Sequence, residues 1–170
     1  MAFTCDVCGE THAGETRDIR MGLPQPIFLL DEEERLGRAY VEEDFAVLHD
    51  PNGDRYFVRA LLELPIVDAE DGYFGYGAWV EVSAEDAVVL GELWVDEEGE
   101  QADPFSGELA NELSPYAFTE GLPVRIRLRD VQLLPLVELE DGEHELVRAQ
   151  RYGISPHRAH QLAATIASSP

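Results

Sequence analysis

The predicted fold is built around one strongly patterned run, Arg55-Tyr-Phe-Val-Arg-Ala-Leu-Leu-Glu-Leu-Pro-Ile66. Every second side chain in this run is apolar, which is the period of a β-strand that buries one face in the core. These residues are Tyr56, Val58, Ala60, Leu62 and Leu64. The opposite face mixes charged and apolar side chains, so we expect it to be half covered. It carries Arg55, Phe57, Arg59, Leu61 and Glu63.

Three further runs predict strands that pair with this one: Gly75–Val82, Val124–Arg129 and Leu136–Glu140. In the second run, apolar residues alternate strictly with arginines, and Glu138 and Glu140 lie in the third. Pairs of arginine and glutamate across neighbouring strands are common on the solvent face of an antiparallel sheet, and each contributes little to stability. These runs therefore predict an antiparallel sheet.

Short helices are predicted beside these strands. Asp31 and Ser83 each precede acidic residues, the pattern of a helix N-cap followed by a first turn that suits the helix macrodipole. Near the end of the sequence, Glu143–Arg151 predicts a helix stopped by Gly153, and Ser155 precedes a last helix. The fold class predicted is α+β, an antiparallel sheet flanked by short helices.

A length of 170 residues predicts a single domain, residues 1–170. Residues 1–22 are polar and rich in turn-forming residues. The prolines of Leu23–Pro26 disfavour a continuing helix, so we expect an extended link there. The prediction is a small N-terminal segment, residues 1–22, joined to an α+β body, residues 23–170.

The composition is strongly acidic: 35 Asp and Glu residues against 12 arginines give a formal net charge of −23, and lysine is absent. A nucleic-acid partner is not expected because this charge repels phosphate, whereas a basic protein partner would be attracted. The absence of lysine excludes Schiff-base chemistry and a Walker-type phosphate loop. No apolar run approaches the ~20 residues of a membrane span, and no signal-peptide pattern is present, so a cytoplasmic protein without membrane association is expected.

The strongest local motif is Cys5-Asp-Val-Cys8-Gly-Glu-Thr-His12. A C-x-x-C turn holds two thiolates on one side of a tight loop, at the separation that tetrahedral zinc needs, and His12 could add an imidazole. Further nitrogen ligands must come from elsewhere in the sequence. The other histidines are His49, His144, His157 and His160. The motif predicts an N-terminal CxxC zinc knuckle.

Two other interpretations of these residues stay open. Cys5 and Cys8 could form a redox dithiol or stay without metal, although no strand precedes Cys5 as it does in thioredoxin-like proteins. His157 and His160 lie three apart on the last predicted helix, which is a spacing that can chelate a metal. No motif assigns catalytic residues.

Several spaced sequence blocks together resemble a known family. They are the Cys5–His12 motif, Phe57–Arg59 leading to Leu64–Asp68, Gly77–Ser83, Phe105–Leu109 with Pro115-Tyr116, and His144–Leu146 followed by Gln150-x-x-Gly153-Ile154. Over nearly the whole chain, this order of blocks resembles a bacterial domain-of-unknown-function family, DUF 2199. The resemblance carries no activity with it.

The resemblance does imply a set of metal ligands. Cys5, Cys8, His12 and His144 match the pattern of the family, whereas His157 and His160 have no counterpart in it. The residues after His144 depart from the family, which has Pro-Leu-Ala where this chain has Glu-Leu-Val. The resemblance therefore implies a Cys2His2 zinc site in which His144 ties the N-terminal motif to the start of a late helix.

Two classes of function follow from these observations. The first is a binding or interaction module with a structural zinc, because four protein ligands leave no open position for water. The alternative is a small zinc-dependent enzyme of the hydrolase type, with three protein ligands, a bound water and Glu10 or Glu143 as a nearby base. A binding module is favoured over an enzyme, because no group of convergent reactive residues can be recognised in the sequence.

Overall fold

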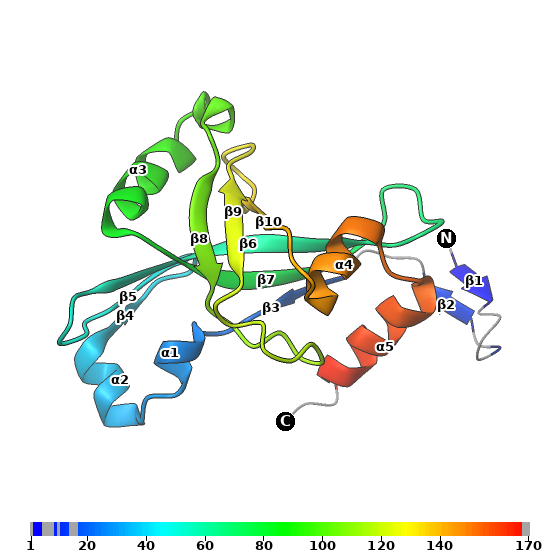
Figure 1. Ribbon diagram of the computed structural model, residues 1–170, viewed down its shortest axis with the longest axis horizontal. Coiled ribbons are helices and arrows are strands. Elements are labelled where there is room, and N and C mark those ends of the chain that lie inside the picture. The colour runs from blue at the N-terminus through cyan, green and yellow to red at the C-terminus, as the bar shows by residue number, and fades with distance from the viewer. Residues whose placement is uncertain (1, 5–8, 10, 14–16, 168–170) are drawn as a thin grey trace.

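Figure 1 shows a computed structural model of the chain, which describes residues 2–4, 9, 11–13 and 17–167. Its strands are β1 (Ala2–Thr4), β2 (Thr11–Ala13), β3 (Arg17–Arg20), β4 (Ala39–Val41), β5 (Phe45–Leu48), β6 (Arg55–Pro65), β7 (Tyr73–Val82), β8 (Phe105–Leu109), β9 (Pro123–Arg127) and β10 (Leu136–Leu139). Its helices are α1 (Gln25–Phe28), α2 (Glu32–Arg38), α3 (Ala84–Trp94), α4 (Glu145–Tyr152), α5 (Pro156–Ala167) and the one-turn 3₁₀ helix η1 (Gly99–Gln101). The chain thus has the mixed α+β character that the sequence predicts.

The main sheet has eight strands in the order β3-β7-β8-β9-β10-β6-β5-β4, and β6 also pairs with β7. Strands β6 to β10 therefore close into a five-stranded barrel, which β3 extends on one side and β5 and β4 extend on the other. The barrel core comes from the alternate residues of β6 that the sequence pattern assigned to it, together with the facing residues of β7. The two-residue period of the central strand is confirmed.

The sheet is mixed, so the prediction of an antiparallel sheet is wrong at two pairs of strands. β10 runs parallel to β6, and β3 runs parallel to β7. The first pair has a geometric cause. β6 to β10 pair antiparallel in chain order, so the first and fifth strands run in the same direction, and closing the ring makes their contact parallel.

The region around residue 22 also differs from the prediction. β3 joins the main sheet from within the segment that the sequence assigned to turns. The extended link stops at Pro24, the N-cap of α1, and Pro26 lies in the first turn of that helix. Proline is tolerated there because the first amide groups of a helix have no partner within it. The predicted extended link is therefore wrong from Gln25 onward.

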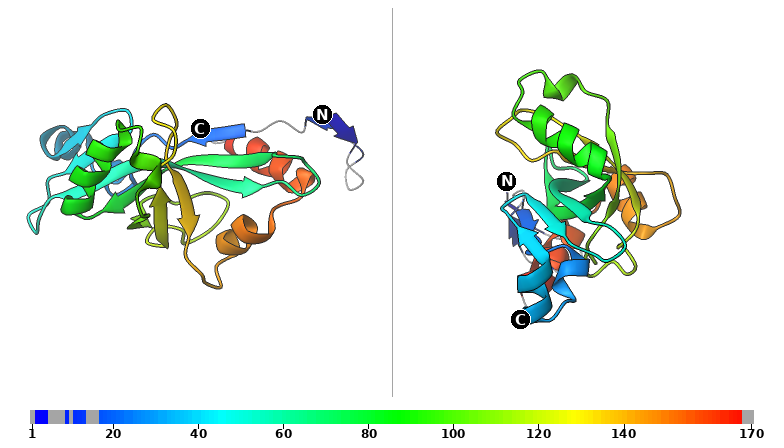
Figure 2. Two further views of the ribbon diagram at one scale, coloured as in Figure 1. Left: turned by 90° about the horizontal axis from the view of Figure 1, so that it is seen from above. Right: turned by 90° about the vertical axis from the view of Figure 1, so that its left-hand side faces the viewer.

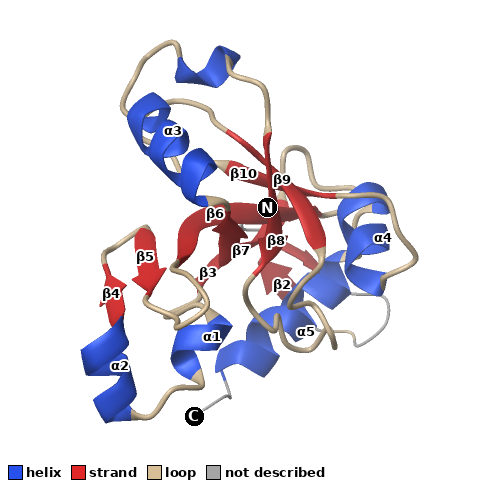
Figure 3. Ribbon diagram, turned by 60° about the vertical axis from the view of Figure 1, so that its left-hand side comes forward, coloured by secondary structure: helices blue, strands red, loops and turns tan. Residues whose placement is uncertain are grey.

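The predicted helix starts at Asp31, Ser83 and Ser155 are confirmed, whereas the helix predicted from Glu143 begins at Glu145. In each of the three confirmed helices, the side chain of the N-cap, Asp31, Ser83 or Ser155, accepts a hydrogen bond from the backbone amide three residues later, at 2.8–3.0 Å. Figures 1 and 3 place α3 on one side of the β6–β7 ribbon and α1 and α2 on the other. The left view of Figure 2 shows this ribbon extending beyond the barrel toward α4 and α5. Among the described residues, no helix has the length and apolar character needed to cross a membrane.

A second, smaller core lies outside the barrel, against α1. It joins the outward side chains of β5, β6 and β7 to residues on and after α1 and β8. Its buried members are Ile27, Ala46, Leu48, Phe57, Trp79 and Ala110. The outer face of β6, which the sequence predicts to be half covered, is thus buried from Phe57 to Leu61 and partly exposed at Arg55 and Glu63. The candidate site lies at this boundary.

Candidate functional site

A cleft of about 510 Å³ lies on the outer face of β6 and β7, between β3 and the loop that joins β9 to β10. Gly77 of β7 pairs with Leu61 of β6 on one side and with Arg20 of β3 on the other. Because Gly77 has no side chain, the floor of the cleft stays open at this position. We call this space the Arg59 cleft, after the buried arginine that lines it.

Arg59 is a buried cation in the middle of β6, with 3% of its surface exposed. Its Nη2 donates to the carbonyl of Met21 at 3.2 Å, and its Cζ lies 4.5 Å from the centre of the Trp79 ring. Its Nε and Nη1 are buried without a hydrogen-bond partner among the residues that the structure describes. A buried charged group with unused donors costs several kcal/mol, so such groups are rare in structures.

Asp44 is the nearest negative charge, and it does not satisfy this guanidinium. Its Oδ1 lies 3.6 Å from Nη1 of Arg59, which is an ion pair but too long for a hydrogen bond. Burial lowers the pKa of Arg59, and the charge of Arg20 adds to this effect, whereas Asp44 and Glu43 oppose it. Burial also raises the pKa of Asp44, against the opposing charge of Arg59. Arg59 still stays protonated, because guanidinium does not deprotonate in proteins.

A rigid network holds Arg59 in place. The indole Nε1 of Trp79 donates at 3.2 Å to the same Met21 carbonyl that accepts from Arg59. The side chain of Asn111, which is 1% exposed, accepts from the backbone amide of Trp79 and donates to the carbonyl of Leu23, both at 2.8 Å. The guanidinium therefore rests on a fixed aromatic surface in the middle of a long strand, as a preorganised site requires.

The other two arginines of the cleft already have partners. Arg20 donates to the carboxylate and the carbonyl of Glu43, at 3.4 and 3.2 Å. Arg129 donates to the carbonyl of Leu134 and lies 4.0 Å from Glu63. Burial raises the pKa of Glu63, and the charge of Arg129 opposes this effect. Arg59 is thus the cation of this cleft that has buried donors without a partner among the described residues.

One wall of the cleft is apolar. It is formed by the loop between β9 and β10 and by the end of α3, and it includes Trp94, Val131, Leu133 and Leu134. Val131 and Leu133 are 38% and 47% exposed, so this wall offers apolar surface that the protein itself leaves open. A buried cation at one end and an apolar wall at the other can hold a small anion that carries an apolar group.

The residues of the predicted zinc site are only partly within the described structure. Cys5 and Cys8 lie outside the described residues, and so does Glu10. His12 lies in β2, paired with Phe3 of β1. Because β1 ends at Thr4, a strand does precede Cys5, and the expectation that none would is wrong. Over the described part of the chain, no three His, Cys, Asp or Glu side chains are grouped as a metal site would need. The zinc knuckle therefore stays a prediction.

His144 has a clear structural role as the N-cap of α4. Its Nδ1 accepts from the amide of Leu146 at 3.0 Å, and its Nε2 lies 2.8 Å from the carbonyl of Ala117. This pattern defines the neutral tautomer with the proton on Nε2, and it uses both ring nitrogens. Coordination of a metal by His144 would require one of these bonds to be replaced. By contrast, α5, which carries His157 and His160, contacts β2, which carries His12.

The capping role of His144 can be tested. We expect His144→Ala to lower the free energy of unfolding by about 1–2 kcal/mol, because it removes a helix cap and a second hydrogen bond. His144→Asn should lose less, since asparagine caps helices well. Urea denaturation with and without a chelator measures both variants. A capping residue gives the same loss in both conditions, whereas a loss that vanishes with the chelator would identify His144 as a metal ligand.

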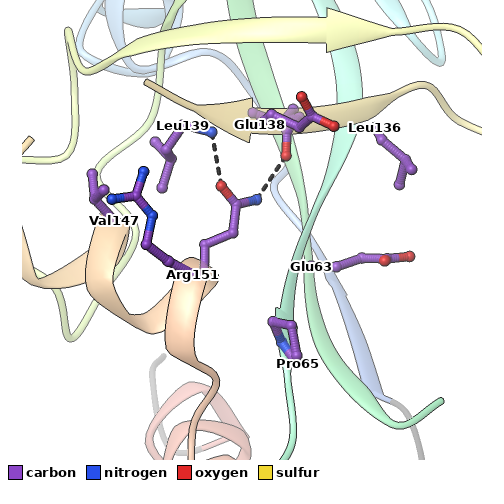
Figure 4. A pocket seen from close by; sticks show the side chains of 9 residues that line it. Glu63, Pro65, Leu136, Glu138, Leu139, Val147 and Arg151 are labelled. Atoms are coloured by element: carbon purple, nitrogen blue, oxygen red, sulfur yellow. Dashed lines mark hydrogen bonds between the residues drawn. The ribbon is translucent and has the colours of Figure 1, made fainter. Parts of the chain in front are cut away.

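A second cavity, of about 290 Å³, lies between α4 and the strands β6 and β10 (Figure 4). The amide group of Gln150 reaches from α4 to the free edge of β10. It accepts from the amide of Leu139 and donates to the carbonyl of Val137, both at 2.7 Å. Gln150 thus completes the pairing of β10 where β6 turns away. The charged residues that line the cavity are Glu63, Glu138 and Arg151. We assign this cavity no ligand.

Gln150→Ala is expected to lower the free energy of unfolding by about 1–3 kcal/mol, because two backbone groups of β10 lose their partners at once. The matched control is Gln161→Ala on α5, whose side chain is exposed; it should change stability by less than about 0.5 kcal/mol. Thermal or urea denaturation of the two variants makes the comparison. Equal stability of both variants would show that water replaces the amide at the edge of β10.

The sequence pattern alone indicates no functional role for Arg59. It placed Arg59 on the mixed face of the central strand, between Phe57 and Leu61. A lone cation flanked by large apolar residues on one strand face is a usable signal, because both neighbours are buried in the structure. The other parts of the site come from distant segments, which no local pattern connects.

Comparison with known proteins gives one match. The family model of DUF2199, described as an uncharacterized protein conserved in bacteria, covers residues 4–154. No curated protein and no solved structure matches the chain. The match spans the barrel, the Arg59 cleft and α4, so it includes all of the elements described as the candidate site. The chain therefore belongs to the DUF2199 family.

Proposed function

We propose that this protein is a binding module that holds a small anionic ligand in the Arg59 cleft. The observation that carries the proposal is the pair of buried donors on Arg59, Nε and Nη1, which lack partners among the described residues. An anion in the cleft would accept from one of them, once the side chains that cover the guanidinium shift, and would also neutralise the charge. Hydrogen bonds between arginine and an anionic oxygen are about twice as strong as those between neutral groups.

The energetics support a ligand at this position. Burying a cation whose partners are incomplete costs stability, and an apolar residue of similar size would avoid that cost. The network of Trp79, Met21 and Asn111 holds the guanidinium in one position, which reduces the entropy lost on binding.

The test is a titration with small anions at low ionic strength. Acetate and inorganic phosphate serve as probes, and isothermal titration calorimetry or a thermal shift reports binding. We expect at least one of them to bind the wild-type chain and Arg55→Met, and neither to bind Arg59→Met. Arg55 lies on the same face of β6, and its guanidinium is already satisfied by Glu81, at 2.8 and 2.6 Å. Failure of every small anion to bind the wild-type chain would remove the proposal.

A structural zinc at the N-terminal motif is a second, independent proposal. Cys5, Cys8 and His12 would supply ligands, and one more would come from the folded part of the chain. The contact between β2 and α5 supports His157 or His160 as that ligand. The two hydrogen bonds of His144 count against it as the ligand, although the family resemblance implies it. A zinc-dependent enzyme would need an open ligand position in addition.

The acidic composition supports a basic protein as a partner of this chain. A net charge of −23 would attract a basic protein and speed its association, and it would repel nucleic acid. Such a complex should weaken as salt rises, because the charges are exposed. We also propose a cytoplasmic location, on the sequence composition alone.

A further inference from the structure

We infer that the ligand of the Arg59 cleft is a small monocarboxylate with an aliphatic body. This inference rests on the proposed function, since it names the class of anion that the cleft would take. Three features of the cleft support it: the balance of its charges, the single cation with unused donors, and its apolar wall.

The charges that line the cleft favour a single negative charge on the ligand. Three arginines face three carboxylates, those of Asp18, Glu43 and Asp44, so the lining is close to neutral before anything binds. Arg20 and Arg129 already have anionic or carbonyl partners. A second negative charge on the ligand would therefore meet carboxylates, within a protein that carries −23 overall. A phosphate dianion or a polyphosphate does not suit this lining.

The donor group of Arg59 limits how a ligand can bind. One face of the guanidinium of Arg59 lies against the Trp79 ring, and its Nη2 is taken by Met21. The two remaining donors, Nε and Nη1, lie in the plane of the guanidinium. They point to opposite sides of it, because the fork that binds both oxygens of one carboxylate is Nε with Nη2, as in the pair of Arg55 and Glu81. A ligand would therefore accept from one of the two, and the choice of a carboxylate over other anions rests on the charges of the lining.

The apolar wall gives the ligand its second feature. Val131 and Leu133 are partly exposed, and they lie in the same cleft as Leu61 and Trp94. An aliphatic chain placed along this wall would remove apolar surface from water on both partners. Each methylene buried in this way increases affinity about fourfold, from the transfer free energy of a CH₂ group. The cleft would thus bind the carboxylate of the ligand at Arg59 and its aliphatic chain at the loop between β9 and β10.

The experiment titrates the full chain with acetate, butanoate, hexanoate and inorganic phosphate at pH 7. We expect hexanoate to bind about sixteenfold more tightly than butanoate, since it has two more methylenes, and phosphate to bind more weakly than either. Leu133→Ser should flatten the dependence on chain length. Val89→Ser is the matched control, because Val89 is exposed to a similar extent on α3 and does not line the cleft.

The outcomes separate this inference from the proposal beneath it. Phosphate binding more tightly than hexanoate would overturn the carboxylate and leave the anion site in place. Equal affinity for all three carboxylates, or an unchanged dependence on chain length in Leu133→Ser, would overturn the aliphatic body. If no anion binds the wild-type chain, the proposed function itself fails. Binding of hexanoate that persists in Arg59→Met would show that the acid does not occupy this cleft.

Discussion

Arg59→Met is expected to stabilise the fold by about 1–2 kcal/mol while it abolishes anion binding. The substitution removes a buried cation with two unused donors and keeps an unbranched side chain in the same space. It loses the contact of the guanidinium with Trp79, worth about 2 kcal/mol, but methionine sulfur restores about 0.3–1.5 kcal/mol of this. In the variant, the indole Nε1 of Trp79 can still donate to the carbonyl of Met21. The relief from burying an incompletely paired charge, several kcal/mol, is therefore the larger effect.

Arg55→Met controls for the loss of an arginine from the same strand. Arg55 makes two hydrogen bonds to Glu81 and is about one-third exposed. We expect its loss to cost about 0.5–1 kcal/mol and to leave anion binding intact. Urea denaturation and anion titration of both variants give the comparison. A loss of several kcal/mol in Arg59→Met would instead make Arg59 a structural residue that the fold cannot spare.

Removal of metal is the second large effect that we expect. If Cys5 and Cys8 hold a structural zinc, Cys8→Ser or a strong chelator should lower the melting temperature and reduce the zinc content from about one per chain to none. The binding free energy of such a site is about 10–16 kcal/mol in isolated zinc fingers. We expect a smaller loss of stability in this protein, because the barrel has a hydrophobic core of its own. Differential scanning calorimetry, together with elemental analysis of the purified protein, measures both quantities.

Histidine variants identify the ligand that completes this site. The double variant His157→Ala and His160→Ala is expected to lower the zinc content, whereas His144→Ala should keep it, because both ring nitrogens of His144 are used within the fold. Cys8→Ser treated with chelator is the baseline, since no further loss should occur there. Metal-free native protein, with the same melting temperature before and after chelation, would rule out the zinc.

The local structure was largely predictable from the sequence. The period of β6 identified the barrel face, and the caps at Asp31, Ser83 and Ser155 identified three helices. The expected pairs Arg127–Glu138 and Arg125–Glu140 also form, at 3.2 and 3.5 Å. Each of these features depends on residues close in sequence or on a single strand pair, so the pattern itself contains the needed information.

The closure of the barrel was not predictable in the same way. No strand was expected at Phe105–Leu109, which forms β8 between β7 and β9. Its glycine, Gly107, packs too closely for a side chain, since an added Cβ would lie 2.6 Å from a methyl group of Val80. A glycine inside a strand weakens the alternating sequence pattern by which the strand is recognised, although close packing requires it here. Without β8, neither the ring of strands nor its parallel closure follows.

The candidate site was predictable only in part. The pattern placed Arg59 on the outer face of its strand, but the cleft also needs Arg20 on β3, Gly77 on β7 and Leu133 in a loop far along the chain. The absence of a side chain at Gly77 opens the cleft beside Arg20 only because β3 pairs with β7 in that register. These relations are tertiary, so a search of local motifs led to the cysteines instead.

The resonance of the Nε–H group of Arg59 in a nitrogen-15 NMR spectrum gives the most direct test of the anion site. This proton is one of the two donors that lack partners among the described residues, and Arg59→Met identifies its signal by removing it. We expect the signal to shift and to saturate as acetate or hexanoate is added, while that of Arg55 stays in place. A signal that stays fixed when the anion is present in excess would show that the buried guanidinium does not receive a ligand.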